Sequence, residues 1–150
     1  AGVTSLPREL YSEIEAYKNV KIIFDETYDL LSNSHAAIVT SGTATLETAL
    51  FKVPQMVVYK AGRVEYFIGS RFVDLRFISL VNLIADQQVI VELLQDKATV
   101  PAIHHELQKL VAAIDYREEI VNHYEKIFRV LDTGSASQTT ADLMMKYLKG

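Results

Sequence analysis

The segment Ala36-Ala37-Ile38-Val39-Thr40-Ser41-Gly42-Thr43-Ala44-Thr45-Leu46-Glu47-Thr48-Ala49-Leu50 decides the fold of this chain. Its first five residues form an apolar, partly β-branched run that is typical of a strand in a parallel sheet with both faces covered. Gly42 permits a sharp turn in which a ligand can approach the backbone, and Ser41 or Thr43 can cap the following helix. The segment therefore predicts a strand, a tight turn and a helix whose first backbone N–H groups suit a phosphate.

Glu47 lies four residues after Thr43, which puts it one turn further along the predicted helix and on the same face. A carboxylate there can reach a sugar hydroxyl of a nucleotide whose phosphate sits at the turn. Taken alone, the turn is better explained as an ordinary helix cap, and Glu47 is also consistent with a solvated helix residue. Both interpretations stay open on these residues.

The composition is that of one folded domain. The chain has 150 residues, of which 49% are hydrophobic, and no cysteine, which excludes disulfides and thiolate sites. A formal net charge of -4 argues against a nucleic-acid-binding protein, which needs a basic face. No apolar run reaches the length of a membrane span. The chain begins without a Met, and we expect it to be a piece cut from a longer protein.

Strand-like and helix-like patterns alternate along the chain, which predicts βαβ units and a parallel sheet. The expected strands cover residues 20–24, 36–40, 56–60 and 77–80, with residues 1–3 ending another. The other helices are expected at 5–19, 25–34, 63–74, 88–95, 99–114, 120–133 and 137–149, and the helix after Gly42 should stop at Val53-Pro54. Residues 81–85 should form a loop. We assign 1–132 to an α/β domain and 133–150 to a separate C-terminal helix.

Ligands of open parallel sheets bind beyond the carboxyl ends of the strands. The residues expected to gather at that edge are Phe24, Asp25, Ser41, Gly42, Thr43, Lys60, Ala61, Gly62 and Asn82.

Four short blocks of sequence, taken together and in their order along the chain, carry a resemblance to a known family. They are Ser41-Gly42-Thr43-Ala44-Thr45-Leu46-Glu47, Met56-Val57-Val58-Tyr59-Lys60, Ser79-Leu80-Val81-Asn82-Leu83-Ile84-Ala85 and Glu92-Leu93-Leu94-Gln95. With Gly134-Ser135-Ala136-Ser137, they resemble the C-terminal half of lipid-A-disaccharide synthase over nearly the whole chain. Two departures stand out: Val81 replaces the usual Pro of its block, and the Pro-Gly-Ser-Arg turn at the start of that domain is missing.

The resemblance implies a Rossmann-like C-terminal domain of a GT-B glycosyltransferase, incomplete at its N-terminal side and carrying extra C-terminal helices. Its partners would be the donor UDP-2,3-diacylglucosamine and the acceptor 2,3-diacylglucosamine 1-phosphate, and its products UDP and the lipid A disaccharide. No cofactor and no metal are implied, since a helix dipole and side chains can carry the leaving diphosphate. The catalytic base would lie in the N-terminal domain. The chain alone should therefore hold no catalytic residue and be inactive, and its location should be cytoplasmic.

The resemblance also assigns roles to residues. The nucleotide-binding set is Phe24, Ser41, Gly42, Thr43, Ala44 and Glu47. Residues 41–44 would receive the phosphates and Glu47 the ribose. The backbone around Phe24 would contact uracil, and Asn82 would line the substrate cleft.

Other interpretations remain. The chain fits another UDP-sugar glycosyltransferase or epimerase domain, or a non-catalytic nucleotide-binding domain. Its basic and aromatic residues at 60–76 suit an acylated anionic lipid or a peripheral membrane contact, or simply a core stripe with solvated Arg residues; they are Lys60, Arg63, Tyr66, Phe67, Arg71, Phe72 and Arg76. The last helix would lack a partner in this chain, so we expect self-association. The four histidines do not have the spacing of a metal site.

Overall fold

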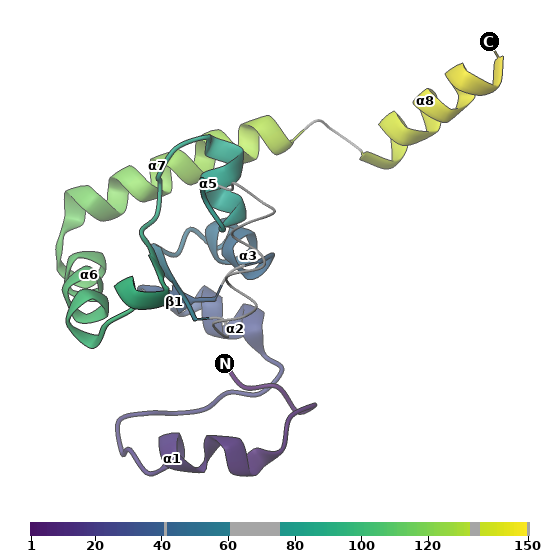
Figure 1. Ribbon diagram of the computed structural model, residues 1–150. Coiled ribbons are helices and arrows are strands. Elements are labelled where there is room, and N and C mark those ends of the chain that lie inside the picture. The colour runs from purple at the N-terminus through teal and green to yellow at the C-terminus, as the bar shows by residue number, and fades with distance from the viewer. Residues whose placement is uncertain (41, 61–75, 133–135, 150) are drawn as a thin grey trace.

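The computed structural model describes residues 1–40, 42–60, 76–132 and 136–149 (Figure 1). The predicted helix at 63–74 lies outside these residues, as do Ser41 and Gly134.

The described strands form a three-stranded parallel sheet in the order β1-β2-β3. They are β1 (Ala37–Val39), β2 (Gln55–Tyr59) and β3 (Glu92–Leu94). Ala37 pairs with Gln55 across the first pair of strands, and Val57 pairs with Glu92 across the second. Parallel neighbours need crossover connections, which the intervening helices supply. The predicted α/β class with a parallel sheet is confirmed.

Helices make up most of the second half of the chain. Those after the first strand are α3 (Ala44–Leu50), α5 (Leu80–Ala85), α6 (Val100–Ala112), α7 (Ile114–Leu131) and α8 (Ala136–Lys149). The short elements are η1 (Arg8–Tyr11), α1 (Ser12–Glu15), α2 (Thr27–Ser32) and η2 (Gln95–Lys97). Thr99 caps the start of α6, because its side chain accepts a hydrogen bond from the Ala102 N–H.

One hydrophobic core joins the sheet to the helices. Helices α3, α5 and α7 contact one another, and α6 contacts both β2 and α7. The buried core residues are Ala49, Met56, Val57, Val81, Val89, Ile90, Leu110, Ile120, Tyr124 and Ile127. Ile120, Tyr124 and Ile127 form the buried face of α7. Helix α8 lies apart from this body at the far end of the molecule (Figure 1).

Three predicted elements were wrong in type. Residues 77–80 form no strand but only a single parallel bridge between Gly42 and Ser79. The expected loop at 81–85 is helix α5, because the Ser79 side chain caps it by accepting from the Asn82 N–H. The segment 88–95, expected as a helix, contains strand β3. The Val57 N–H of β2 donates a hydrogen bond to the Val91 carbonyl, just before β3, at 2.9 Å.

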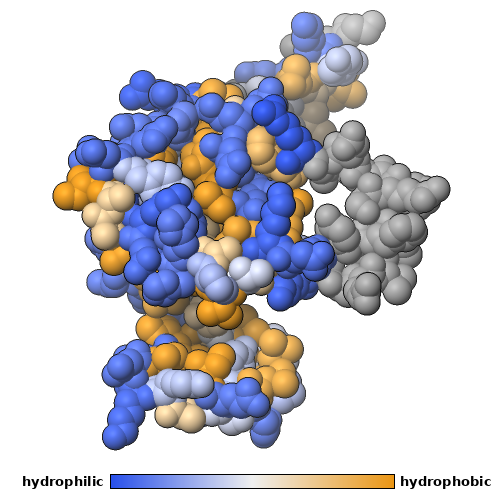
Figure 2. Space-filling view, turned by 60° about the vertical axis from the view of Figure 1, so that its left-hand side comes forward, coloured by the Kyte–Doolittle hydropathy of each residue, from blue (hydrophilic) through white to orange (hydrophobic). Residues whose placement is uncertain are grey.

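The first strands are reduced relative to the prediction. The runs at 1–3 and 20–24 meet only in a parallel bridge between Gly2 and Phe24. Strand β1 is not covered on both faces as expected, because Ile38 is 50% exposed. The helix after Gly42 ends at Leu50, and the left-handed backbone of Lys52 (φ +56°) turns the chain before Pro54 is reached. The N-terminal segment that carries α1 lies below the main body (Figure 1), and Figure 2 shows hydrophobic side chains on its surface.

Candidate functional site

The turn before α3 has the conformation that its glycine predicts. Gly42 has φ +108°, a region that L-residues with a side chain rarely adopt. Its carbonyl accepts from the N–H of Thr45 at 3.2 Å and from the Thr45 hydroxyl at 2.8 Å. The predicted cap by Thr43 is not formed, since the Thr43 side chain makes no capping hydrogen bond. Thr45 stabilises the turn instead.

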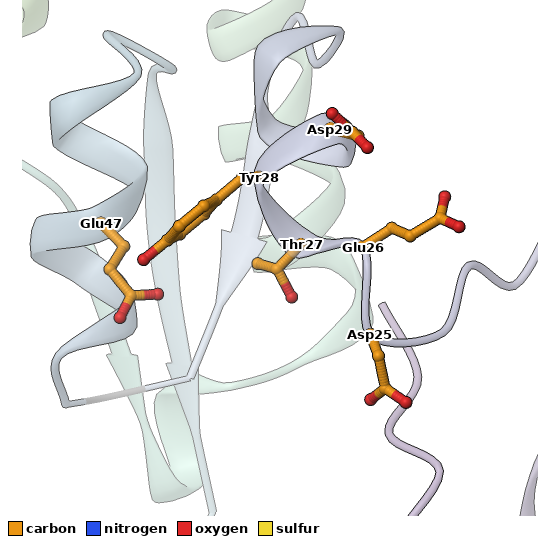
Figure 3. Close-up of a pocket in the computed structure, with 6 residues that line it drawn as sticks. All are labelled: Asp25, Glu26, Thr27, Tyr28, Asp29 and Glu47. Atoms are coloured by element: carbon orange, nitrogen blue, oxygen red, sulfur yellow. The ribbon is translucent and has the colours of Figure 1, made fainter.

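Glu47 projects from α3 into an open hollow of about 570 Å³. The other lining residues come from the start of α2 and the loop before it; they are Asp25, Glu26, Thr27, Tyr28 and Asp29 (Figure 3). Glu47 is half-buried, and within the described parts of the chain its carboxylate has no hydrogen-bond or ion-pair partner. The loop before α2, the start of α2 and the middle of α3 are thereby brought to one hollow.

Tyr28 is a residue of this hollow that the sequence interpretation did not single out. It lines this hollow and a second one of about 310 Å³, which is shared with Glu47, Leu50 and Phe51. Its ring lies 5.5 Å from the Phe51 ring, centroid to centroid, at an interplanar angle of 35°. No motif marks Tyr28, because its place beside Glu47 depends on how α2 packs against α3.

Phe24 leads directly into the hollow through Asp25. The bridge to Gly2 uses the Ile23 carbonyl (2.8 Å) and the Asp25 N–H (3.2 Å). Since successive peptide groups of an extended chain face opposite sides, the N–H and C=O of Phe24 itself point away from Gly2. The half-buried Phe24 ring packs edge-on against Tyr11, with centroids 5.2 Å apart.

Asn82 is not placed as the sequence predicts. It is completely buried, and both ends of its side-chain amide have internal partners. Its Oδ1 accepts from the N–H groups of Val89 (2.8 Å) and Ile90 (3.0 Å). Its Nδ2 donates to the Ile90 carbonyl (2.9 Å) and to Glu92 Oε1 (2.7 Å). The Asn82 side chain therefore shapes the turn that leads into β3 and does not line a cleft among the described residues.

Glu92 is the second residue that sequence reasoning missed. Its Oε1 accepts from the Ser79 N–H (3.0 Å), the Ser79 hydroxyl (2.7 Å) and Asn82 Nδ2, while Oε2 accepts from the Ile78 N–H (2.9 Å). One carboxylate on β3 thus holds the segment that begins α5. Its presence in a recurring block was a signal, but its four donors come from residues that are distant in sequence.

A buried polar group also holds α3 in position. The Gln55 Nε2 donates to the Thr45 carbonyl (3.0 Å) on α3 and to the Tyr124 hydroxyl (3.1 Å) on α7. The hydroxyl in turn donates to the Val53 carbonyl. Burial raises the pKa of Tyr124 well above its ordinary value, so this hydroxyl stays protonated. The residue that stabilises the Gly42 turn is therefore anchored to the core.

Lys60 and Arg76 are the members of the predicted lipid surface that lie in the described part of the chain. Arg76 lies 3.9 Å from Asp86 in an ion pair and 5.0 Å from the centre of the Phe77 ring, and Lys60 is exposed. The other residues of that predicted surface lie outside the described part. Among the helices that the structure describes, none has the length and apolar character needed to cross a membrane.

Comparison with known proteins identifies the family. The model of the lipid-A-disaccharide synthetase family matches residues 8–145. The chain belongs to this family. It is 37% identical over 125 residues to a lipid-A-disaccharide synthase from Coxiella burnetii (strain Dugway 5J108-111), covering 83% of this chain and 33% of the relative.

Relatives in other bacteria agree with this assignment to the lipid-A-disaccharide synthetase family. A lipid-A-disaccharide synthase from Syntrophus aciditrophicus is 34% identical over 130 residues, or 87% of this chain and 34% of the relative. One from Acidobacterium capsulatum is 39% identical over 107 residues, or 71% of this chain and 27% of the relative. The chain thus spans about a third of the length of these relatives.

Proposed function

We propose that this chain is the nucleotide-sugar-binding part of a lipid-A-disaccharide synthase. The enzyme would transfer 2,3-diacylglucosamine from its UDP conjugate to 2,3-diacylglucosamine 1-phosphate and release UDP. The single observation that carries the proposal is the family match over residues 8–145. Because the chain spans about a third of its relatives, we expect it to bind the donor without completing the reaction.

The geometry of the site supports separate contacts for the diphosphate, the ribose and the uracil of the nucleotide. Gly42 and Thr43 are exposed and Ala44, the first residue of α3, is half-buried. Their backbone N–H groups would bind the diphosphate, with Ser41 as a further proposed contact. Helix α3 has only seven residues, so hydrogen bonds should contribute more than its dipole. Glu47 would accept hydrogen bonds from the ribose hydroxyls, and the peptide groups of Phe24 would face the uracil.

The burial of Asn82 changes the role we propose for it. Its four internal hydrogen bonds support an indirect contribution, in which it fixes the chain between α5 and β3. Substrate would then contact the backbone of this region and not the Asn82 amide.

Calorimetric titration of UDP into the full-length protein that contains these residues tests the proposal. Glu47→Ala should weaken UDP binding about tenfold, which corresponds to roughly 1.4 kcal/mol. Glu13→Ala, at an exposed glutamate on α1, is the matched control and should bind UDP like the wild type. Absence of UDP binding by the wild-type protein would contradict the proposal.

Formation of the disaccharide and UDP from the two acylated substrates separates the enzyme from its alternatives. A non-catalytic domain would bind UDP and release no product, and an epimerase or another glycosyltransferase would convert a different UDP-sugar. The acylated substrates would bring the protein to the cytoplasmic face of the inner membrane.

We also propose that α8 is covered in the working protein. Its apolar residues Leu143, Met144, Tyr147 and Leu148 are between 51% and 84% exposed. In the isolated chain such a face favours self-association, which sedimentation at rising concentration would detect. A strictly monomeric chain at high concentration would contradict this part of the proposal.

A further inference from the structure

We propose that Tyr28 is a nucleoside-contacting residue of this site and that the hollow beside it selects the uncharged part of the ligand. The inference rests on the proposed function, because it assigns one end of the same nucleotide to a place in the molecule.

The first argument is the position of the ring. Tyr28 is 62% exposed, and it lines two hollows that are also both lined by Glu47. Figure 3 shows it extending from α2 toward Glu47 on the neighbouring helix. A ligand that reaches the Glu47 carboxylate therefore passes along the Tyr28 ring.

The second argument is that the ring is held before any ligand arrives. Phe51 packs against it at 5.5 Å between centroids. The backbone beneath it is held as well, since the Ser32 hydroxyl donates to the Tyr28 carbonyl at 2.7 Å. A side chain ordered in this way loses less entropy on binding than a free one.

The third argument is charge. Four of the residues that line the hollow are acidic; they are Asp25, Glu26, Asp29 and Glu47. The Asp25 carboxylate accepts hydrogen bonds from Thr4, and those of Glu26 and Asp29 point away from Glu47, whereas the Glu47 carboxylate lies near the end of the Tyr28 ring (Figure 3). A diphosphate placed beside the Glu47 carboxylate would be repelled, whereas a ribose can donate its hydroxyl hydrogens to it. The nucleotide should therefore lie with its nucleoside in the hollow and its phosphates toward Gly42.

An aromatic ring in that hollow suits a nucleoside. Nucleobases and aromatic side chains stack face to face, and this contact is tolerant of sequence because it uses the π-face. The Tyr28 hydroxyl adds a donor and acceptor at the end of the ring nearest Glu47. The ring should supply most of the binding contribution, and the hydroxyl a smaller part.

Titrations of UDP and UMP into the full-length protein test the assignment. Tyr28→Ala should weaken both ligands by the same factor, about tenfold, because both carry the nucleoside. Tyr28→Phe keeps the ring and should retain most of the affinity. Gly42→Ala, which disturbs the phosphate turn, should weaken UDP more than UMP. Tyr17→Ala removes a ring that is 67% exposed on the N-terminal segment and should change neither ligand.

The outcomes distinguish the two proposals. If wild-type protein binds UDP and folded Tyr28→Ala binds it equally well, the role of Tyr28 is refuted while the proposed function stands. If Tyr28→Ala weakens UDP but not UMP, Tyr28 contacts phosphate and the orientation is refuted. If wild-type protein binds neither ligand, the proposed function fails and this inference fails with it. Circular dichroism and thermal unfolding of each variant establish that the altered chains are folded.

Discussion

Glu47 and Glu92 are two glutamates on neighbouring elements of the same sheet-and-helix unit, and they are used in opposite ways. Glu92 accepts four hydrogen bonds from Ile78, Ser79 and Asn82. Glu47 faces an open hollow and has no hydrogen-bond or ion-pair partner among the described residues. A carboxylate whose lone pairs are all used inside the fold is structural, whereas one left open beside a ring and a turn is available to a ligand. The contrast predicts which changes will reduce stability and which will reduce binding.

The largest expected loss of stability is at Asn82. Asn82→Ala would leave the buried N–H groups of Val89 and Ile90 without acceptors. Two such groups should lower the free energy of unfolding by roughly 3–5 kcal/mol, measured by urea denaturation. Asn122→Ala, at an exposed position on α7, is the control and should change the free energy of unfolding by less than about 0.5 kcal/mol. If Asn82→Ala changed the free energy of unfolding only slightly, the contrast between residues bonded inside the fold and residues open to a ligand would be contradicted.

Glu92→Gln comes next. The glutamine amide places an NH2 group where one carboxylate oxygen now accepts a hydrogen bond from a backbone N–H. One hydrogen bond is thereby replaced by a contact between two donors. We expect the free energy of unfolding to fall by about 1.5–3 kcal/mol. Glu118→Gln on the exposed side of α7 should leave it nearly unchanged. Equal effects at the two positions would contradict the role of Glu92.

The Tyr124 hydroxyl should give a smaller effect that depends on pH. Tyr124→Phe removes the hydrogen bonds to Gln55 and Val53 and should cost about 1 kcal/mol at neutral pH. Burial raises the pKa of Tyr124, and burial together with the bond to Glu106 raises that of Tyr116. Above pH 10, the ordinary tyrosine pKa, the unfolded chain releases these protons first, so stability should fall as pH rises.

Unfolding curves between pH 8 and about pH 11 check this slope. Tyr124→Phe should make the decline shallower, because one of the two buried hydroxyls no longer titrates. An unchanged slope would mean that Tyr124 ionises freely in the folded protein.

The smallest effect on stability is expected at the open carboxylate. Glu47→Ala removes no hydrogen bond of the side chain within the described residues, and it should shift the free energy of unfolding by less than about 0.5 kcal/mol. Chemical denaturation of the variant, compared with its UDP titration, measures both properties in one protein. A large loss of stability would show that Glu47 is structural after all, like Glu92.

Much of the fold could be predicted from local patterns. The strand, Gly42 turn and helix at 37–50 follow from an apolar run, a glycine and a helical period, and the structure has all three. The cap of α6 at Thr99 was equally local. Such features depend on neighbours in the sequence, so a single chain carries enough information to predict them.

The errors occurred where distant segments decide the structure. Residues 88–95 have apolar positions that fit a helix or a strand, and only pairing with β2 settles them as β3. Helix α5 carried a local signal in Ser79, a capping residue three positions before Asn82, that the loop prediction passed over. Tyr28 was not predictable, because its place beside Glu47 depends on how α2 packs against α3. The sequence block marked Glu92 but did not reveal its hydrogen-bond partners Ile78, Ser79 and Asn82.

Glu92 has a consequence for the order of folding. Strands β1 and β2 are joined by one short helix, whereas β2 and β3 are joined by a much longer connection that includes α5. The first pair therefore closes the shorter loop and should form first. Because Glu92 belongs to β3 and also holds the start of α5, strand docking and helix capping should occur as one cooperative step. A kinetic analysis would then find that substitutions at Ser79, Asn82 and Glu92 share one position on the folding pathway, later than substitutions in β1.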